Sequence, residues 1–477
     1  MLLIGWYAFR KTTNDIEGFM LGGRGVGPVV TALSAGAADM SGWMLMGLPG
    51  AVFVQGFSGM WIVLGLSLGA YLNYVFVAPR LRIYTKIAND SITIPDFFEN
   101  RFKDGSRMLR WISAAVILVF FTFYTSSGMV SGGRFFESAF GMDYRFGLFL
   151  VTAIVIAYTL FGGYLAVSLT DSVQGLIMFA ALVTIPVVVV SHLGGVKESF
   201  DVVRTLDPDH FAWFRNTTIA GIISLLAWGL GYFGQPHILV RFMSITSAGE
   251  LKKARRIGMS WMVIGLVGAS MIGFLGFGYV QHNGLQLDDP ETIFILLSGI
   301  LFNPYVTGIL LAALLAAIMS TISSQLLVTA SALTGDFYRT FLRREASGKE
   351  LVLVGRLSVL LIAIIALIMS YTPNDTILNL VGYAWAGFGS AFGPAILLSL
   401  FWKRMNKWGA LSGIVVGALA VIIWVRLGLS GVLYEMIPAF FASMISIIVI
   451  SLLTKAPKAE IQAEFEQTGS ELARNVK

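Results

Sequence analysis

An aspartate stands near the middle of a long apolar stretch of this chain. Asp39 lies in the run 27–54, among small residues and two glycines, and Pro49 follows it. An ionisable residue inside a membrane-spanning segment is costly and marks a functional site by default. Small residues, Gly and Pro also make a poor helix interior, and the backbone groups that a break frees must line a cavity, because lipid cannot satisfy them. The alternative role is a structural carboxylate that binds neighbouring backbone.

A second interruption falls in the apolar run 218–240. Gly229, Gly231 and Gly234 match the spacing GxGxxG there. A nucleotide-binding loop needs a preceding strand and a βαβ unit, so we reject that interpretation within a membrane span. Pro236 removes a backbone N–H and clashes with the preceding turn. We therefore expect a kink or break here as well.

A cluster of hydroxyl side chains supplies the third candidate. Ser320, Thr321, Ser323 and Ser324 lie in the charge-free run 305–333, and their spacing places several of them on one helical face. Hydroxyl and carbonyl oxygens are suitable ligands for a small hard cation. The alternatives are hydroxyls that bond back to their own helix and small residues that let helices pack closely. Proximity to the broken segment that carries the aspartate would favour the cation site.

The composition indicates what must position these groups. The chain has 477 residues, of which 56% are hydrophobic and 13% charged, whereas soluble domains carry about 25% charge. There is too little polar surface to cover soluble cores of that composition, so we predict an all-α polytopic membrane protein. The absence of Cys excludes disulfides, thiolate nucleophiles and Cys-based zinc sites. Four scattered His argue against a His-ligated metal centre, and the sequence shows no nucleophile and base arranged as in an enzyme.

Twelve apolar runs are each long enough for a bilayer-spanning helix, which needs about 20 residues. They are 27–54, 58–78, 111–133, 146–166, 172–192, 218–240, 257–280, 305–333, 351–371, 377–402, 408–425 and 433–453. If residues 10–26 are cytoplasmic and the spans alternate, 27 of the 33 Lys and Arg fall on the cytoplasmic side, as the positive-inside rule requires. That distribution explains the net charge of +6 without a nucleic-acid partner. Residues 1–9 are apolar but too short to span, and we expect them to be the end of a longer helix.

The two interrupted segments open two sets of five spans, 27–192 and 218–402. Because five is odd, the second set runs in inverted topology. Gly- and Pro-interrupted helices at matching positions of inverted repeats indicate a transporter binding site near the membrane midplane. The rest of the chain divides into a partial N-terminal helix with a cytoplasmic loop, an extracellular loop, two extra C-terminal helices and a polar, loosely ordered cytoplasmic tail. These segments are 1–26, 193–217, 403–453 and 454–477.

Several motifs resemble those of one family. The segments concerned are 21–24, 34–43, 94–97, 228–237, 316–325 and 383–389. They occur in the order and at the spacing of the sodium/solute symporter family, and they look most like its sodium/proline symporter branch. The resemblance implies a LeuT-type five-plus-five inverted repeat with extra N- and C-terminal helices. It also implies a plasma-membrane transporter that couples sodium entry to uptake of L-proline by alternating access, with no oligomer required.

The same resemblance implies the site residues. The main sodium site would use the carbonyls of Ala37, Met40 and Ala317 and the hydroxyls of Ser320 and Thr321, with Asp39 beside the cation. The residues around proline would be Ser41, Gly42, Trp43, Tyr124, Trp228, Tyr232, Gln235 and Pro236. A possible second sodium site would comprise Asp171, Ser323 and Ser324. The alternative role of the aspartate in that set is the N-cap of a helix over 172–192.

The chemistry of these residues agrees with a zwitterion that has an apolar ring. A carboxylate suits the amide-rich start of a half-helix, and aromatic faces suit both the ring and an ammonium group. Ala38 departs from the proline branch, which often has Ser there, and this bears on affinity. A sodium-coupled symporter of another small solute, such as a betaine or a carboxylate, is the same-class alternative. A channel would need a continuous polar pore and a sensor an added signalling domain, and the sequence shows neither.

Overall fold

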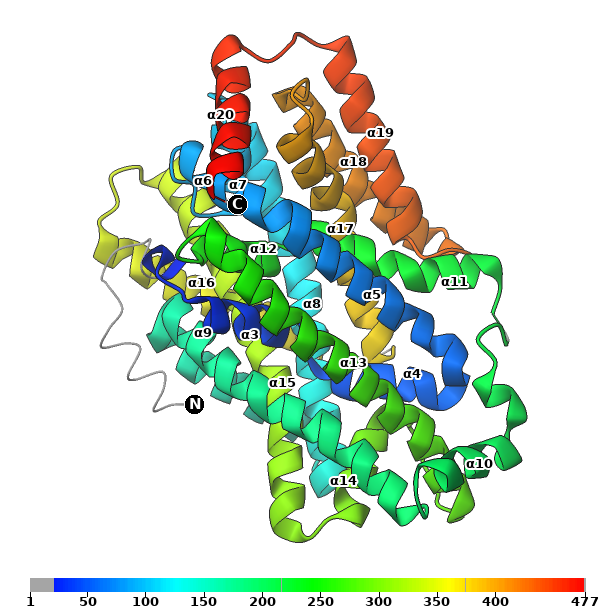
Figure 1. Cartoon of the computed structure of the whole chain (residues 1–477). Helices are drawn as coiled ribbons and strands as arrows, with labels where there is room; N and C mark the ends of the chain where they lie inside the picture. Colours follow the sequence, from blue (N-terminus) through cyan, green and yellow to red (C-terminus); the bar gives the residue numbers. More distant parts are fainter. Residues whose placement is uncertain (1–20, 216, 374, 476–477) are drawn as a thin grey trace.

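The computed structural model describes residues 21–215, 217–373 and 375–475, and these residues form helices joined by short loops (Figure 1). Nine of the described helices are long and apolar enough to cross a membrane, or ten if one bent pair counts as a single span. The predicted all-α class is therefore confirmed. Residues 1–9, which we expect to end a longer helix, lie outside the described residues.

The helices follow one another in chain order and carry the labels of Figure 1. The first half contains α3 (Pro28–Asp39), α4 (Leu48–Gln55), α5 (Trp61–Leu72), α6 (Ala78–Ile87), α7 (Ile94–Phe102), α8 (Met108–Phe140), α9 (Tyr144–His192) and α10 (Val196–Leu206). The second half contains α11 (Ile219–Leu226), α12 (Pro236–Ser244), α13 (Leu251–His282), α14 (Ile293–Leu301), α15 (Pro304–Ser331), α16 (Gly348–Met369), α17 (Ile377–Phe401), α18 (Lys407–Arg426), α19 (Met436–Leu453) and α20 (Ala459–Asn475). Tighter or wider helical turns join some of them end to end, so one helical stretch can hold more than one expected span.

The turn between α4 and α5 is such a case. The stretch Trp43–Ile87 is 45 residues long, which at helical rise is about 68 Å, roughly twice the membrane core. Gly56 interrupts it with a φ of 63°. A Cβ at this position would lie 2.3 Å from the carbonyl oxygen of His210. The expected spans 27–54 and 58–78 therefore meet at a turn that only glycine fits.

A second joined pair lies in α9. The expected spans 146–166 and 172–192 both fall within this 49-residue helix. Its N-cap is Asp143, whose carboxylate accepts backbone hydrogen bonds from the first helical turn. Asp171 lies inside the helix, so the interpretation of Asp171 as an N-cap is wrong. Asp171 directly precedes an apolar run, and this local pattern is typical of a helix start. It does not show that the helix already runs from Tyr144 through Asp171.

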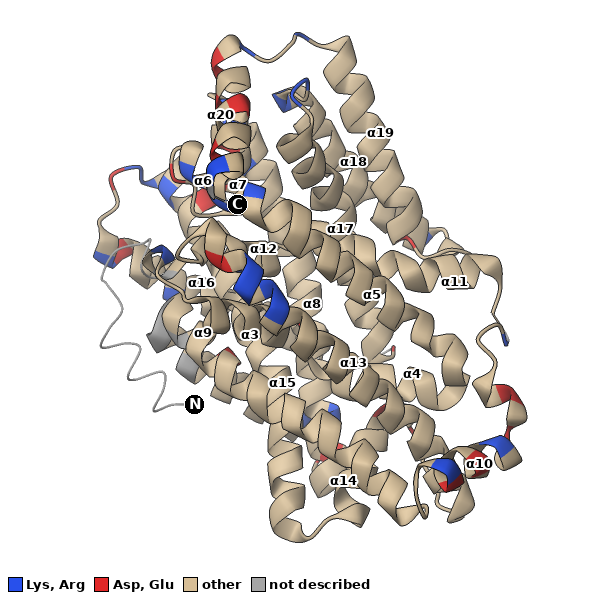
Figure 2. Cartoon of the chain, in the orientation of Figure 1, with Lys and Arg blue, Asp and Glu red and all other residues tan. Residues whose placement is uncertain are grey.

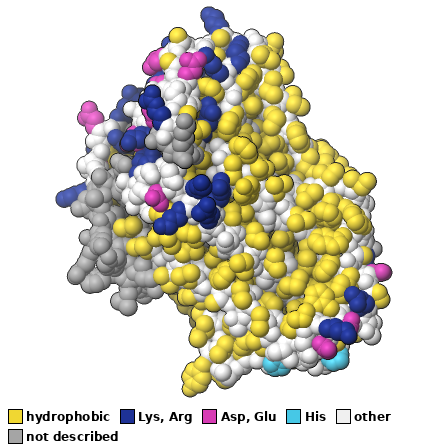
Figure 3. All heavy atoms as spheres, viewed as in Figure 1, with side chains coloured by type: hydrophobic (Ala, Val, Ile, Leu, Met, Phe, Trp, Pro, Cys, Tyr) yellow, Lys and Arg dark blue, Asp and Glu magenta, His cyan; other side chains and the backbone are white. Residues whose placement is uncertain are grey.

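The surface is divided into charged ends and an apolar belt. Charged side chains gather around α6, α7 and α20 at one end of the molecule and around α10 at the other (Figure 2). Apolar side chains cover the surface between them (Figure 3). On α5 and α16, for example, Leu68 and Leu361 are 59% and 53% exposed. Large exposed apolar surface of this extent fits contact with lipid rather than water.

The C-terminal segment is more ordered than the sequence suggests. Residues 459–475 form α20, and its residues Ile461 and Thr468 are buried. The Phe465 ring lies 4.8 Å from the guanidinium carbon of Arg80 in α6, and Glu464 pairs with Lys103 after α7 at 2.6 Å. The expectation of a loosely ordered tail is wrong here, because apolar residues at helical spacing give this polar segment a face that packs.

Candidate functional site

The first helix breaks directly after Asp39, and the break frees a backbone carbonyl. In a regular helix the Ser41 N–H would donate to the Ala37 carbonyl, but here it donates to the Asp39 carbonyl at 3.0 Å. The Ala37 carbonyl instead accepts the hydroxyls of Ser320 and Thr321 from α15, at 2.8 and 3.4 Å. The break and α15 therefore meet at one oxygen atom.

The same helix contributes a second carbonyl to this cluster. Ser320 Oγ lies 3.0 Å from the Ala317 carbonyl oxygen. Oxygens that ligate a hard cation from about 2.4 Å, at right angles to one another, are about 3.4 Å apart, so oxygens at the observed spacing can converge on one ion. The structure thus brings Ala37, Ala317, Ser320 and Thr321 together, and Met40 is buried at the same break. Their role as sodium ligands stays a prediction.

Asp39 joins the first break to the second. Its Oδ2 accepts a hydrogen bond from the Tyr232 hydroxyl at 2.5 Å, while its Oδ1 is buried without a hydrogen-bond partner. Its backbone carbonyl accepts hydrogen bonds from the Trp43 indole at 3.0 Å and from the Tyr124 hydroxyl at 3.3 Å. No three His, Cys, Asp or Glu side chains of the described residues gather in a group that could hold a metal ion. Any cation bound at this break would therefore meet mainly neutral oxygens.

The second break lies where the sequence predicts it. Residues Ala227–Gly234 form a tight 3₁₀ helix, and Pro236 opens α12 after a bend of 44°. A Cβ at Gly231 would lie 2.0 Å from the indole nitrogen of Trp385 in α17. Gly231 and Gly234 thus allow close packing against α17, and Gly229 allows close packing against α5, so these glycines serve helix packing and not nucleotide binding.

Aromatic rings from both breaks form one group. Trp228 lies 6.2 Å from Trp43 and 6.4 Å from Trp385, measured between ring centroids, and Tyr232 meets Trp385 edge-on at 5.2 Å. The Trp385 indole donates to the Trp228 carbonyl at 2.8 Å, and the Gln235 amide donates to the Trp385 carbonyl at 3.1 Å. Trp385 was not among the predicted site residues. Its place in the motif 383–389 was the signal that could have found it.

Two further predicted residues shape the first break. Ser41 Oγ accepts the Trp43 N–H at 3.3 Å. A Cβ at Gly42 would lie 2.8 Å from the side chain of Ser131 in α8 and 3.2 Å from that of Ile318 in α15. The absence of a side chain at this position therefore lets the break approach both helices.

A second buried polar cluster surrounds Asp171. Its Oδ2 accepts hydrogen bonds from Ser34 at 2.8 Å, from the Arg241 guanidinium at 3.2 Å and from Ser324 at 3.3 Å. Arg241 also donates to the Ser324 hydroxyl at 2.7 Å. Ser323 does not join this set of contacts, since its hydroxyl donates to a carbonyl of its own helix.

Arg241 is the member of this cluster that the sequence did not indicate. It was counted among the basic residues that flank a span on the cytoplasmic side. Its side chain is instead 2% exposed and forms an ion pair with the fully buried Asp171. A guanidinium therefore supplies the positive charge next to this carboxylate, as a buried acid requires.

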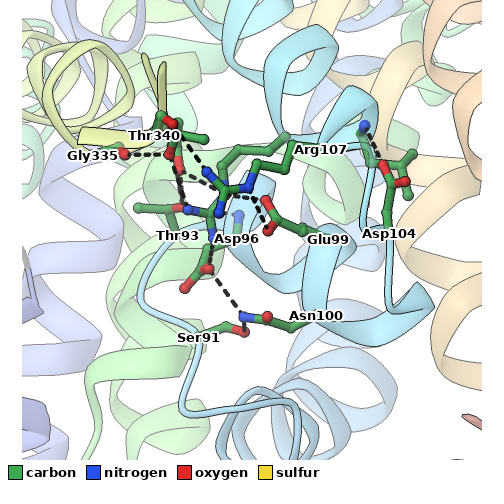
Figure 4. Close-up of polar contacts among 12 residues, drawn as sticks. Ser91, Thr93, Asp96, Glu99, Asn100, Asp104, Arg107, Gly335 and Thr340 are labelled. Atoms are coloured by element: carbon green, nitrogen blue, oxygen red, sulfur yellow. Dashed lines mark hydrogen bonds and ion pairs between the residues drawn. The ribbon is translucent and has the colours of Figure 1, made fainter. Parts of the chain in front are cut away.

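An ion-pair cluster lies at the end of the molecule that carries α6 and α7 (Figure 4). Arg110 in α8 pairs with Asp96, with Glu99 at 2.6 Å and with Asp336 at 3.7 Å. The Thr93 hydroxyl donates to Asp336 at 3.2 Å. These contacts tie α7 and α8 to the wide helical turn Ala332–Leu342 that extends α15.

This cluster and a second contact lie toward the two ends of the molecule. A cavity of about 30 Å³, bordered by Pro236, Arg241 and Asp336, separates the second break from the cluster. At the opposite end, the Glu291 carboxylate accepts the backbone N–H groups of Ile377 at 2.9 Å and Leu378 at 3.2 Å. Residues of the two breaks are themselves buried, since Asp39, Trp43 and Tyr232 are 2%, 1% and 4% exposed.

A family model described as "Sodium:solute symporter family" matches residues 19–417. The chain belongs to the sodium:solute symporter family. It is 63% identical to the osmoregulated proline transporter OpuE of Bacillus subtilis, over 96% of this chain and 93% of that protein. It is 61% identical to the high-affinity proline transporter PutP of the same organism, over 98% of each.

The fold of this family member also matches solved structures. A Na⁺-coupled sialic acid symporter superimposes with a TM-score of 0.81 at 22% sequence identity, over 96% of each chain. At that identity the likeness concerns the fold. It confirms the LeuT-type inverted repeat implied by the motifs, and with the apolar helices it makes the chain a multi-pass membrane protein.

Proposed function

We propose that this chain is a plasma-membrane symporter that couples sodium entry to the uptake of L-proline by alternating access. Two relatives above 60% identity carry the name of proline transporters, and this supports proline over a betaine or another carboxylate. The family name itself specifies sodium-coupled solute transport.

One structural observation carries the proposal. The Ala37 carbonyl accepts hydroxyls from α15, while two residues later Asp39 binds Tyr232 of the second break at 2.5 Å. A cation bound at the Ala37 carbonyl would order the backbone from Ala37 to Asp39, and Asp39 contacts Tyr232 in the second break, where proline is proposed to bind. Binding of each partner would then favour binding of the other, which is the coupling that symport needs.

The proposed main sodium site consists of the carbonyls of Ala37, Met40 and Ala317 and the hydroxyls of Ser320 and Thr321, with Asp39 beside them. A hydroxyl oxygen that donates in the described contacts also has lone pairs with which to ligate a cation. The α15 hydroxyls can therefore turn toward sodium without a change in their position.

The proposed proline site lies where the two breaks face each other. The substrate carboxylate would meet backbone N–H groups at Ser41 and Gly42, because a half-helix starts there and its N-terminal end attracts anions. For this the Ser41 N–H would exchange its bond to the Asp39 carbonyl for one to the substrate. The apolar ring would lie among aromatic side chains of both breaks. The remaining members of the proposed site are Trp43, Tyr124, Trp228, Tyr232, Gln235 and Pro236.

A second sodium at Asp171, Ser323 and Ser324 stays a conditional hypothesis. Asp171 and Ser324 are in contact, but the Arg241 guanidinium binds both of them. Sodium would need to replace that guanidinium, because two cations at one buried carboxylate would repel each other. The second site therefore depends on movement of α12, which carries the arginine.

The proposed orientation follows from the charges. With the Lys- and Arg-rich end inside the cell, α20 and the C-terminus are cytoplasmic.

Each sodium that enters releases about 2.3 kcal/mol per 100 mV of membrane potential, and a tenfold sodium gradient adds about 1.4 kcal/mol. One sodium per proline would then sustain an accumulation on the order of 500-fold.

The test is uptake of labelled proline by proteoliposomes that contain the purified chain. Uptake should require a sodium gradient, should fail with potassium alone, and should be inhibited by excess unlabelled proline more strongly than by glycine betaine. Sodium-driven uptake of betaine that unlabelled proline does not inhibit would refute the assignment of proline as the substrate. Uptake that is equal in sodium and potassium would refute the coupling.

A further inference from the structure

A tyrosine outside the two expected repeats reaches the proposed proline site. Tyr434 lies in the loop between α18 and α19, the two extra C-terminal helices. Its ring stacks on the Trp228 indole, with ring centroids 5.5 Å apart and 16° between the ring planes. Since Trp228 is one of the residues proposed to surround proline, the C-terminal hairpin contacts the substrate site through this ring.

Hydrogen bonds to three helices fix the position of Tyr434. Its hydroxyl donates to the Gly382 carbonyl in α17 at 2.7 Å, and its backbone N–H donates to the Ser224 hydroxyl in α11 at 3.0 Å. The residue before it is held from α18, because the Trp424 indole donates to the Leu433 carbonyl at 2.9 Å. The ring cannot turn away from Trp228 without loss of the bond to α17.

The other contacts of the Trp228 indole make its orientation specific. A Cβ at Gly382 would lie 3.1 Å from Trp228 Cζ2 and 3.9 Å from Tyr434 Cε2, so the indole occupies space that glycine leaves open. Trp385 lies nearly parallel to it, at 24° between the ring planes. The Trp228 indole is therefore packed between Gly382, Trp385 and Tyr434. Of these three residues, Tyr434 is the one that lies outside the two repeats.

We propose that Tyr434 is a positioning residue for proline recognition, and that it acts by holding the Trp228 indole in the orientation that the substrate meets. Without the tyrosine ring the indole would sample more rotamers, and proline binding would have to order it. The inference rests on the proposed function, because it requires that Trp228 contact proline. It assigns a role in substrate recognition to the hairpin formed by α18 and α19.

The test compares four proteins in proteoliposomes at saturating sodium. They are the wild type, Tyr434→Ala, Tyr434→Phe and the matched control Phe441→Ala, which removes a 51% exposed aromatic side chain from α19. The measurements are the KM and maximal rate for proline, and the inhibition constants of azetidine-2-carboxylate and pipecolate, which have four- and six-membered rings. The ratio of these constants to the proline KM reports how well the pocket selects ring size.

We expect Tyr434→Ala to raise the proline KM by about 2- to 12-fold, the range that one aromatic pair supplies, and to weaken selection between ring sizes. Tyr434→Phe keeps the ring and should stay nearer to the wild type, and Phe441→Ala should match the wild type. A purely structural role would lower the maximal rate through loss of folded protein, but it would leave the KM and the ring-size ratios unchanged.

If Tyr434→Ala has the proline KM and the ring-size ratios of the wild type, Tyr434 is not a positioning residue for proline recognition. If that variant fails to reach the membrane, Tyr434→Leu replaces it, because leucine keeps apolar bulk without a ring. Its proline KM and its ring-size ratios then decide in the same way. Gly382→Ala offers an independent variant, since the added methyl should displace the indole and raise the KM in the same direction. Loss of sodium-dependent proline uptake in the wild type itself would refute the proposed function, and this outcome is distinct from a failure confined to Tyr434.

Discussion

Replacement of Ser320 by Ala should weaken the sodium activation of proline uptake strongly. The Ser320 hydroxyl is fully buried and lies 2.8 Å from the Ala37 carbonyl oxygen and 3.0 Å from that of Ala317. Its removal takes one oxygen from the proposed ligand set. A hydrogen-bonding group that faces a charge is worth about 1.5–3 kcal/mol, which corresponds to an increase of about 10- to 150-fold in the half-saturating sodium concentration.

The assay is initial uptake of labelled proline by proteoliposomes over a range of sodium concentrations at saturating proline. Thr321→Ala should shift sodium activation less, because its contact with the Ala37 carbonyl is longer, at 3.4 Å. Thr329→Ala is the matched control on the same helix. Its hydroxyl is also buried but donates to the carbonyl of Gln325 at 2.6 Å, so sodium activation should be unchanged.

Equal sodium activation in Ser320→Ala and the Thr329→Ala control would show that the Ser320 hydroxyl does not bind the coupled ion. If Ser320→Ala abolishes uptake, equilibrium binding of proline at graded sodium takes the place of the transport assay. If proline binding then depends on sodium in the same way as in the wild type, the Ser320 hydroxyl has no part in sodium affinity and its proposed role as a ligand is refuted.

Three further results are expected. Trp228→Ala and Tyr232→Ala should each raise the dissociation constant for proline by about 2- to 12-fold, from the loss of aromatic contacts; direct binding at wild-type affinity in both would exclude this pocket. The reversal potential of proline flux should indicate one sodium per proline, because Arg241 already neutralises the buried carboxylate beside it; a ratio of two that falls to one in Ser324→Ala would establish the second site. Burial lowers the pKa of His210 in the loop after α10, so the unfolded state binds the proton more tightly. Stability should therefore fall as the pH drops below about 6.5, the usual His value, and a series of thermal midpoints should show a shallower fall in His210→Gln.

Local sequence patterns predicted the elements of this site but not all of its pairings. The break after Asp39 follows from small residues and glycine in one short segment, and the bend at Pro236 follows from a single residue type. The contact of Ser320 with the first break came from family motifs. The two breaks were accessible because each is encoded within a few residues of the position it affects. The contact of Ser320 with Ala37 spans 283 positions and was accessible only through the family motifs.

The pairings that the sequence did not reveal join residues far apart in the chain. Arg241 and Asp171 are 70 positions apart, and nothing near the arginine distinguishes it from basic residues that flank a span. Tyr434 lies outside both repeats, so no internal symmetry points to it. Gly56 similarly reads as one glycine among 52, and only the structure shows that its positive φ and the nearby His210 carbonyl exclude a side chain at this turn.

The shared carbonyl at Ala37 bears on the half of the transport cycle in which the protein carries nothing. A symporter must return to face outward without its cargo, and a site built from carboxylates would then carry uncompensated negative charge through the membrane field, at about 2.3 kcal/mol per 100 mV for each charge. The hydroxyls of Ser320 and Thr321 can accept a cation with their lone pairs or donate their hydrogens to the Ala37 carbonyl, because a hydroxyl serves in both directions. The ligand oxygens of Ala37, Ser320 and Thr321 are thus neutral and hydrogen-bonded to one another without sodium, so they carry no charge through the membrane field in the return step. Asp39 beside them is the one group of the proposed set that can be charged.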